Sequence, residues 1–471
     1  MGSLFAALNS ASNALDAFQR SIDVTQNNVT NANSPGYAKQ IPTLQSANFV
    51  SANGLSGGVV EQTQDSRNQF ADTMVRNQIS IAGAYQQLQT SLAPLQNVFD
   101  VSDNSPIPSA LNQLFQSFSQ WSTQPSNSAY QSAVVAAAQQ VSAAFQQTAS
   151  QLSSIRNATD QDLQSTVAQI NQDAAKIQAY NVSLGKNGGT DAGAQANLEA
   201  TLEDLSNLAN VQVLTGVGGT VTVLLGGQTP LVIGAQLNTL QVQADTSGTP
   251  GAPPNAKIVD STGTDVTAQV TSGALSGLLT VRNNILPSLA GGGTQVGSLN
   301  TLAQSIADSV NNLLAQGSST STPPYQPGAP LFTYNATSPT SVASSLNVNQ
   351  SLTPDQLVAF DPGPPAASNG IALQLANLDN TGSSQLGGST FTQYLSAMTA
   401  QVGNAVSTAN AGATAQASVV SQAKTLQQQL SGVSLDEEAV RLVQLQSAYQ
   451  AASKVVTVID ELTQTLINMV Q

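Results

Sequence analysis

The 471-residue sequence contains neither cysteine nor histidine. Without cysteine there are no disulfides, thiolate nucleophiles or zinc–thiolate sites. Without histidine there is no Ser-His-Asp triad, and the most frequent general base and metal ligand are missing. Carboxylate or lysine chemistry remains open, but most classes of enzyme are excluded. We therefore expect a protein that is not an enzyme, with no catalytic residues, no metal and no cofactor.

Charge is scarce as well. Only 8% of the residues are charged, and the formal balance is −14. The twelve basic residues are scattered singly, so no basic patch is available for nucleic acid. An acidic chain is also not attracted to an anionic membrane surface. The polar surface must come from Gln, Asn, Ser and Thr, and such a neutral surface suits dense packing of many identical copies.

Long apolar runs are missing too. No segment approaches the ~18 consecutive apolar residues of a membrane span. The N-terminal segment has no basic start, and polar residues interrupt its apolar stretch, so it does not match a cleavable secretion signal. The composition is nevertheless typical of an extracellular protein. No standard export signal therefore explains how the chain would reach that location.

Both ends of the chain carry one narrow apolar stripe, with residues at alternating steps of three and four. Each stripe fits a helix of ~30 residues, about 45 Å long. A stripe this long and narrow requires partner helices, so we expect the two ends to pair with each other and then with neighbouring subunits. The predicted assembly interface consists of Leu4, Leu8, Leu15, Phe18, Ile22, Val29, Leu442, Leu445, Tyr449, Val456, Ile459 and Leu466.

The region between the ends changes character twice. Helical periodicity dominates residues 70–208, where Gly83 and Pro94 are expected to bend the first helix. Short β-type runs follow from residue 211 to about 269, and Gly218-Gly219 predicts a hairpin turn between the first two. Helical pattern returns over residues 276–314 and 391–430. The fold class predicted is mainly α with a β-rich inserted centre, in an elongated, nested, multi-domain chain.

This nesting predicts three domains. Residues 1–37 and 432–471 form a helical coiled-coil assembly domain. A long-helix shaft takes residues 38–208, 274–316 and 386–431. The remaining residues, 209–273 and 317–385, form a β-rich domain that faces outward and carries Pro/Gly loops.

Two segments resemble a known family. Residues 22–29 read IDVTQNNV and residues 31–37 read NANSPGY, which resembles the N-terminal signature of bacterial flagellar rod, hook and hook-associated proteins. Residues 431–439, SGVSLDEEA, and 445–455, LQSAYQAASKV, are similar to the C-terminal signature of the hook-associated protein 1 (FlgK) family. The matching residues are Asn28, Asn31, Asn33, Pro35, Gly36, Tyr37, Gly432, Leu435, Asp436, Glu437 and Glu438.

The resemblance implies an axial flagellar architecture and a function. The expected function is that of a non-catalytic structural adaptor at the junction between hook and filament, which polymerises through its terminal helices. Its expected partners are further copies of itself, the hook protein, a second junction protein and a flagellar export chaperone. The expected location is extracellular, in the flagellum, after export through the flagellar secretion channel. Another axial component, such as hook or rod protein, is the nearest alternative.

The acidic run 436–438 allows two interpretations. Ser434 and Glu437 have the spacing of a capping box, in which Ser434 accepts from the first amides of the helix and Glu437 reaches back. A pair of catalytic carboxylates would instead indicate a secreted cell-wall hydrolase. Neighbouring residues at a helix start point in different directions, which favours the cap. An adhesin presented by the β-rich centre is a further alternative that the sequence leaves open.

Overall fold

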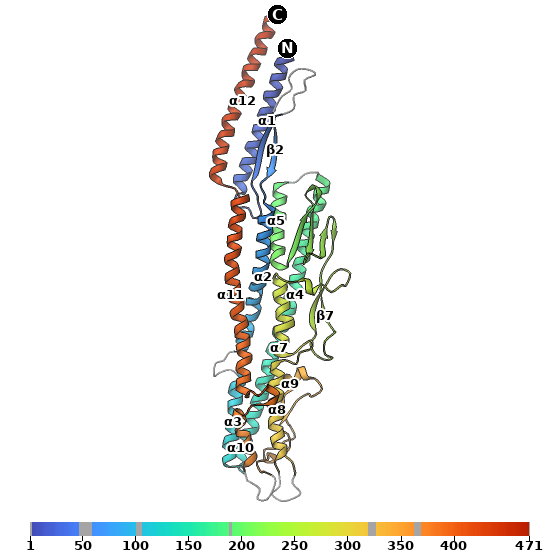
Figure 1. Ribbon diagram of the computed structural model, residues 1–471, viewed down its shortest axis with the longest axis vertical. Coiled ribbons are helices and arrows are strands. Elements are labelled where there is room, and N and C mark those ends of the chain that lie inside the picture. The colour runs from blue at the N-terminus through green and yellow to red at the C-terminus, as the bar shows by residue number, and fades with distance from the viewer. Residues whose placement is uncertain are drawn as a thin grey trace.

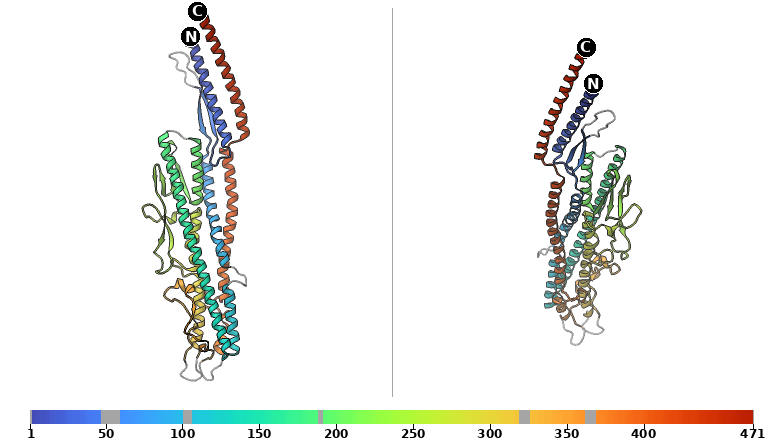
Figure 2. Two further views of the ribbon diagram at one scale, coloured as in Figure 1. Left: turned by 180° about the vertical axis from the view of Figure 1, so that it is seen from behind. Right: turned by 45° about the horizontal axis from the view of Figure 1, so that its top comes forward.

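The computed structural model is an elongated, mainly helical molecule with both termini at the same end (Figure 1). It describes residues 2–46, 59–99, 106–187, 191–318, 326–361 and 369–470. The terminal helices lie side by side at that end and project beyond the rest of the molecule (Figure 2); they are α1 (Gly2–Asn31) and α12 (Leu435–Val470). The predicted fold class, mainly α with a small β-rich insertion, is confirmed.

Long helices build the shaft below the terminal pair. They are α2 (Gln69–Val98), α4 (Ser128–Asn187), α5 (Ala192–Leu208) and α11 (Phe391–Ser431). The side chain of Asn68 caps α2 by accepting from the amides of Phe70 and Ala71, and a capping box at Thr390 begins α11. Neither Gly83 nor Pro94 ends α2, which continues through both. These two capped helices pack along each other and connect the terminal pair to the far end.

Two separate hydrophobic cores stabilise the shaft. The first lies at the end far from the termini, where Trp121, Phe118 and Phe145 are fully buried. It is formed by the first half of α4, the lower part of α11 and several shorter helices, which are α3 (Pro106–Thr123), α7 (Leu286–Ala290), α8 (Ser298–Gln316), α9 (Val342–Ser345) and α10 (Gly370–Ala376). The second core joins the other half of α4 to α5, to α6 (Ala274–Thr280) and to the sheets.

The sheets lie on the flank of α4 and are antiparallel. Four strands pair in sequence order, namely β3 (Val211–Thr215), β4 (Val221–Leu225), β5 (Thr229–Ile233) and β6 (Gln236–Leu237), and a separate pair is formed by β7 (Gln241–Asp245) and β8 (Asn255–Val259). The predicted hairpin is present: β3 and β4 are joined through Gly218 and Gly219, both of which adopt positive φ. Alternate residues of β4 are buried, which attaches this sheet to the second core.

The two parts of the predicted outward-facing domain belong to different cores. Strands β3 to β8 contribute to the second core, whereas Leu331, Phe332 and Val342 are buried in the first. In the described residues between α8 and α11 the elements are short, and most of them pack on α4 or α8 because each is too small to bury its own apolar residues. These elements are β9 (Phe332–Thr333), η5 (Pro339–Ser341), β10 (Asn347–Val348), η6 (Pro354–Gln356), η7 (Leu378–Asn380) and η8 (Ser384–Leu386).

A second hairpin packs against α1. Its strands, β1 (Gln40–Ser46) and β2 (Val59–Asp65), pair in antiparallel register from Gln40 opposite Asp65 to Ser46 opposite Val59. The sequence pattern placed these residues in the shaft as an extended connector, but both strands contact α1. Through the described part of the chain, no helix is long and apolar enough to cross a membrane.

Two glycines in the long helices provide a matched test of shaft packing. A Cβ at Gly83 would clash with the backbone oxygen of Asn207, whereas a Cβ at Gly403 of α11 would meet nothing within 4 Å. We expect Gly83→Ala to destabilise the protein by about 1–3 kcal/mol, because α2 and α5 must separate. Gly403→Ala should stabilise it by about 0.5–1 kcal/mol, because alanine favours the helix. Urea unfolding of both variants measures the two shifts, and equal shifts would contradict the close packing of α2 on α5.

Candidate functional site

The C-terminal helical segment is interrupted where the terminal pair meets the shaft. Helix α11 ends at Ser431 and α12 begins at Leu435. The last carbonyl of α11, that of Ser431, accepts the backbone N–H of Lys39 at 2.9 Å and the hydroxyl of Ser66 at 3.3 Å. The hydroxyl of Ser431 accepts the backbone N–H of Asn68 at 3.0 Å. The segments on both sides of the β1–β2 hairpin therefore hold the helix break, which we call the joint (residues 28–40, 66–68 and 431–441).

Asn28 is the centre of the joint. Its side chain is completely buried, and its amide group donates to the carbonyl of Gln40 at 2.7 Å and to a carboxylate oxygen of Glu438 at 3.0 Å. Its Oδ1 accepts from the hydroxyl of Tyr37 and from the backbone N–H of Gln40, both at 2.9 Å. One side chain thus connects α1, the start of the hairpin and α12, and uses its full donor and acceptor capacity.

Lys39 pairs with the acidic residues at the start of α12. Its Nζ lies 2.9 Å from Glu437 Oε2 and 3.1 Å from Glu438 Oε1. Burial opposes the charge on Lys39, but the hydrogen bonds and charges of Glu437 and Glu438 outweigh it and raise the pKa of Lys39. The hydrogen bond from Lys39 lowers the pKa of Glu437, so the pair stays ionised at neutral pH and is lost as the pH falls through the lowered pKa of Glu437.

A tight turn connects α1 to the hairpin. The backbone N–H of Tyr37 donates to the carbonyl of Ser34 at 3.2 Å, and Gly36 has φ +71°, as the Pro35-Gly36 pair predicts for a type II turn. A side chain at Gly36 would clash with the carbonyl of Ala196 on α5. Glycine is therefore required both by the turn and by its contact with the shaft.

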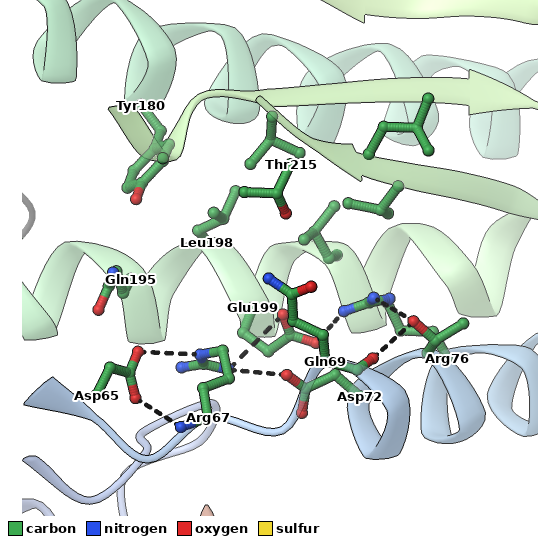
Figure 3. Close-up of a pocket in the computed structure, with 16 residues that line it drawn as sticks. Asp65, Arg67, Gln69, Asp72, Arg76, Tyr180, Gln195, Leu198, Glu199 and Thr215 are labelled. Carbon is green, nitrogen blue, oxygen red and sulfur yellow. Dashed lines mark hydrogen bonds and ion pairs between the residues drawn. The ribbon is translucent and has the colours of Figure 1, made fainter. Parts of the chain in front are cut away.

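A cluster of charged side chains lies below this turn, in a cleft of about 630 Å³ (Figure 3). Arg67 donates to the carbonyl of Gly36 at 2.7 Å and lies 3.6 to 3.7 Å from the carboxylates of Asp65, Asp72 and Glu199. Arg76 forms a buried ion pair with Glu199. The cluster therefore links the turn after α1 to α2 and α5.

The carboxylates of this cleft, those of Asp65, Asp72 and Glu199, outnumber its two arginines by one. Burial raises the pKa of Glu199, and the nearby charge of Arg76 opposes that rise. Asp72 also accepts from the amide of Gln427 on α11 at 2.8 Å. Each acidic group of the cleft has a partner, and no group of three or more acidic side chains that could hold a metal ion occurs in the part of the chain described. The arrangement is that of an ionic connection between elements.

Most of the apolar residues predicted for assembly are half-buried, on the two helices α1 and α12 that pack against each other. Ile22 is buried and Val29 is exposed, while the rest of the predicted set is half-buried, namely Leu8, Leu15, Phe18, Leu442, Leu445, Tyr449, Val456 and Ile459. Leu466 is exposed, and the side chain of Leu4 lies outside the described residues. The burial pattern agrees with a helix pair, and the role of these residues between subunits stays a prediction.

A second apolar stripe runs along α12 on a face that does not contact α1. Its members are between 51% and 78% exposed and lie roughly a third of a turn from the first stripe at ~100° per residue. They form two groups, Val440 with Val443 and, further along the helix, Val455, Val458, Leu462 and Met469. The sequence analysis missed this stripe, because it assigned the apolar residues of α12 to one seam only.

The family-motif residues divide into two groups. Asn28, Gly36, Tyr37, Gly432, Glu437 and Glu438 meet at the joint, whereas Asn33, Pro35, Leu435 and Asp436 are exposed at its edge. Asn31 bonds locally to the carbonyl of Asn27 and to Ser34. Lys39 and Arg67 escaped the sequence analysis, and the rarity of basic residues was the signal that could have found them.

The predicted cap of α12 needs a correction. The Ser434 hydroxyl does accept from the backbone N–H of Glu437, at 3.5 Å. The carboxylate of Glu437, however, extends to Lys39 instead of turning back to the amide of Ser434. The ion pair competes for the same carboxylate, so only half of the capping box forms. Glu437 therefore connects α12 to the joint.

Asn28 and its neighbour Asn27 test the joint. Asn28→Ala leaves the buried carboxylate of Glu438 and the backbone of Gln40 without their partner, which should cost about 2–4 kcal/mol. We expect faster hydrogen exchange in β1, β2 and the first turns of α12, with unchanged protection in the shaft. Asn27 is exposed, and Asn27→Ala is the control that should leave exchange unchanged. Equal exchange in the two variants would contradict a joint that depends on Asn28.

Known proteins resemble the chain along its whole length. A model of the flagellar hook-associated protein FlgK helical domain matches residues 92–332, just over half of the chain. A model of the flagellar basal body rod FlgEFG protein C-terminal region matches residues 427–469, which include the second half of the joint. The second match begins in the last turns of α11, and the first ends well before that helix begins.

Individual relatives agree with these models. Flagellar hook-associated protein 1 of Bacillus subtilis is 25% identical over 508 residues, covering 99% of both chains. Its counterpart in Salmonella typhimurium is 24% identical over 64% of this chain and 55% of its own length. The flagellar hook junction protein FlgK from Burkholderia pseudomallei has a similar fold, with a TM-score of 0.64 and 16% identity over 76% of this chain and 99% of its own. The chain belongs to the flagellar hook-associated protein FlgK family.

Proposed function

We propose that this protein is a non-catalytic structural adaptor that polymerises through α1 and α12 at the junction between hook and filament. The family is one of flagellar components located at that junction, outside the cell. The finer statement, that the terminal helices are the polymerising elements and that no catalysis occurs, is our proposal. It rests mainly on one observation, the exposed apolar stripe of α12.

The exposed stripe is costly for an isolated molecule and useful in an assembly. Six large apolar side chains of the second stripe remain in contact with water. Contiguous exposed apolar surface marks interaction sites, and fully burying one valine or leucine contributes about 1.5–3 kcal/mol. One seam of α12 already packs on α1, so the second seam is available for another subunit. We propose further copies of this chain, the hook protein and a second junction protein as partners in the assembly, and an export chaperone as the partner of α12 before assembly.

The charged groups support a structural function. The chain contains no histidine or cysteine, and the carboxylates of the Arg67–Glu199 cleft are engaged in ion pairs. Glu437 and Glu438, the acidic residues that a hydrolase would need at the start of α12, are held by Lys39. Two neighbouring carboxylates that share one lysine differ from the two opposed acids that hydrolysis of a glycosidic bond uses.

Val458→Asp tests the exposed stripe without disturbing the helix pair. Val458 is 53% exposed in the monomer, so the variant should fold normally, yet a charge there would oppose burial against a neighbour. We expect the affinity for the assembly to fall by about tenfold or more. Gln464→Asp adds the same charge at an exposed polar position of α12 and should assemble normally. Soft-agar motility and a blot for flagellin in the medium measure the effect, and full motility of Val458→Asp would contradict the mechanism.

Deletion of the gene tests the junction role itself. We expect cells that carry hooks without filaments and release flagellin into the medium, because the filament has no adaptor to start from. Electron microscopy of the cells, with a blot of the medium, gives the result. Complementation by the wild-type chain is the control. Intact filaments in the deletion strain would overturn the proposed function, and digestion of peptidoglycan by the purified monomer would overturn the non-catalytic part.

A further inference from the structure

Two of the twelve basic residues of this acidic chain line the same cavity. Arg156 lies in the middle of α4, and Arg282 lies on η4 (Val281–Ile285), a π-helical turn between α6 and α7. One carboxylate lies between them: Asp160 accepts from Arg282 Nε at 2.6 Å. Among the charged residues that line the cavity there are therefore two cations and one anion.

The cavity has the size and the lining of a small binding site. It encloses about 410 Å³, within the range of ligand pockets. Helix α4 contributes one wall, β7 and β8 contribute the opposite wall, and η4 contributes Arg282. Four exposed polar side chains at its edge make no side-chain hydrogen bond to any described residue, namely Ser153, Asn157, Gln164 and Gln243.

The local backbone holds the two arginines in this cavity. A π-turn is rare and adds one residue to a helical turn, and here it contains both Arg282 and Asn283. Asn283 bonds both the N–H and the carbonyl of Ala256 on β8, at 2.8 Å each, so the turn is fixed to the sheet. Arg156 Nη2 donates to the carbonyl of Gly291 at 2.6 Å, which fixes the second guanidinium.

Several polar atoms of the cavity are buried without a hydrogen-bond partner in the described part of the chain. They are Arg156 Nε, Arg282 Nη1 and Asn255 Oδ1. Arg282 is only 4% exposed. An unpartnered buried N–H on a charged group costs free energy that native proteins normally avoid. A half-turn of the Asn255 amide would replace its oxygen with an N–H donor.

The electrostatics of the cavity, like its geometry, favour binding of an anion. Burial lowers the pKa of Arg156, the charge of Arg282 lowers it further, and Asp160 opposes the change. At Arg156, the unfavourable charge of Arg282 therefore outweighs the favourable charge of Asp160. A single negative charge in the cavity would remove this imbalance.

We propose that this cavity binds an oxyanion, specifically a carboxylate group held by Arg156 and Arg282. The planar fork of a guanidinium matches a carboxylate with two parallel hydrogen bonds. One negative charge on the ligand would bring the net charge of the cavity to zero, whereas a phosphate dianion would leave an excess of negative charge next to Asp160. Both unpartnered N–H groups are closed to solvent. Binding therefore requires Arg156, the more exposed of the two arginines, to release the carbonyl of Gly291 and turn toward the anion.

Two sources supply this chemistry. One is a small organic acid in solution. The other is an acidic side chain of a second copy of this chain, which carries 26 Asp and Glu residues. The guanidinium groups would bind a carboxylate in both cases. Binding of a small organic acid depends on the concentration of that acid, whereas binding of a second copy depends on the concentration of the protein.

The arginine Nε–H resonances of the full-length, ¹⁵N-labelled protein measure binding directly. The chain has six arginines, namely Arg20, Arg67, Arg76, Arg156, Arg282 and Arg441. Sodium acetate is titrated against sodium chloride at constant ionic strength. We expect the resonances of Arg156 and Arg282 to shift together and saturate while the other four stay in place. A shift of the same two resonances on raising the protein concentration without acetate identifies a second copy as the source.

Matched variants separate the site from its surroundings. Arg156→Gln should abolish the saturable shift of Arg282, and Arg20→Gln, which removes the same charge from an exposed position of α1, should preserve it. Asn157→Asp places a negative charge at the exposed edge of the cavity and should weaken acetate binding by about tenfold without affecting the fold. The proposed site would be overturned if the Nε–H resonances of all six arginines shifted without saturation, or if no resonance shifted with either acetate or protein concentration. Tighter saturation by inorganic phosphate would overturn the assignment to carboxylate.

Discussion

The arrangement of the terminal helices on the shaft depends on the hydrogen bonds of one buried side chain. Asn28 bonds to the backbone of the hairpin, to Tyr37 and to the carboxylate of Glu438, and so fixes α1, the hairpin and α12 to each other. Lys39 then compensates the negative charge at the start of α12. Without these contacts, the three-residue break after α11 would leave α12 attached to the shaft by a short peptide alone.

The joint and the shaft are stabilised by different interactions. The joint is polar, with an amide at its centre and ion pairs around it, and the cleft below it holds Arg67, Arg76 and Glu199. The shaft contains two apolar cores, with Trp121 and Phe118 in one and Val223 and Leu225 in the other. A polar network is worth most when every member is satisfied, and it specifies one geometry. That property suits a connection that must keep the terminal helices in a fixed direction.

The terminal helices have two functions that use different faces. One face of α12 packs on α1 and forms the pair, while the other presents valines and leucines to solvent. The low charge of the chain, 8% of its residues, lets such faces approach without strong repulsion. The cavity between Arg156 and Arg282 is the exception, since it concentrates positive charge on an otherwise acidic molecule.

The sequence by itself determined the elements whose signals are local. Heptad spacing predicted α1 and α12, Gly218-Gly219 predicted the β3–β4 hairpin, and Pro35-Gly36 predicted the turn before the hairpin. These features depend on residues within a few positions of each other. Only the tertiary structure decided which residues meet across the chain. The pairing of Asn28 with Glu438, 410 residues away, and the assignment of residues 331–378 to the first core follow from packing, which leaves no periodic trace in the sequence. The second stripe of α12 was visible as apolar residues, but its exposure became known only once α1 was seen to cover the other face.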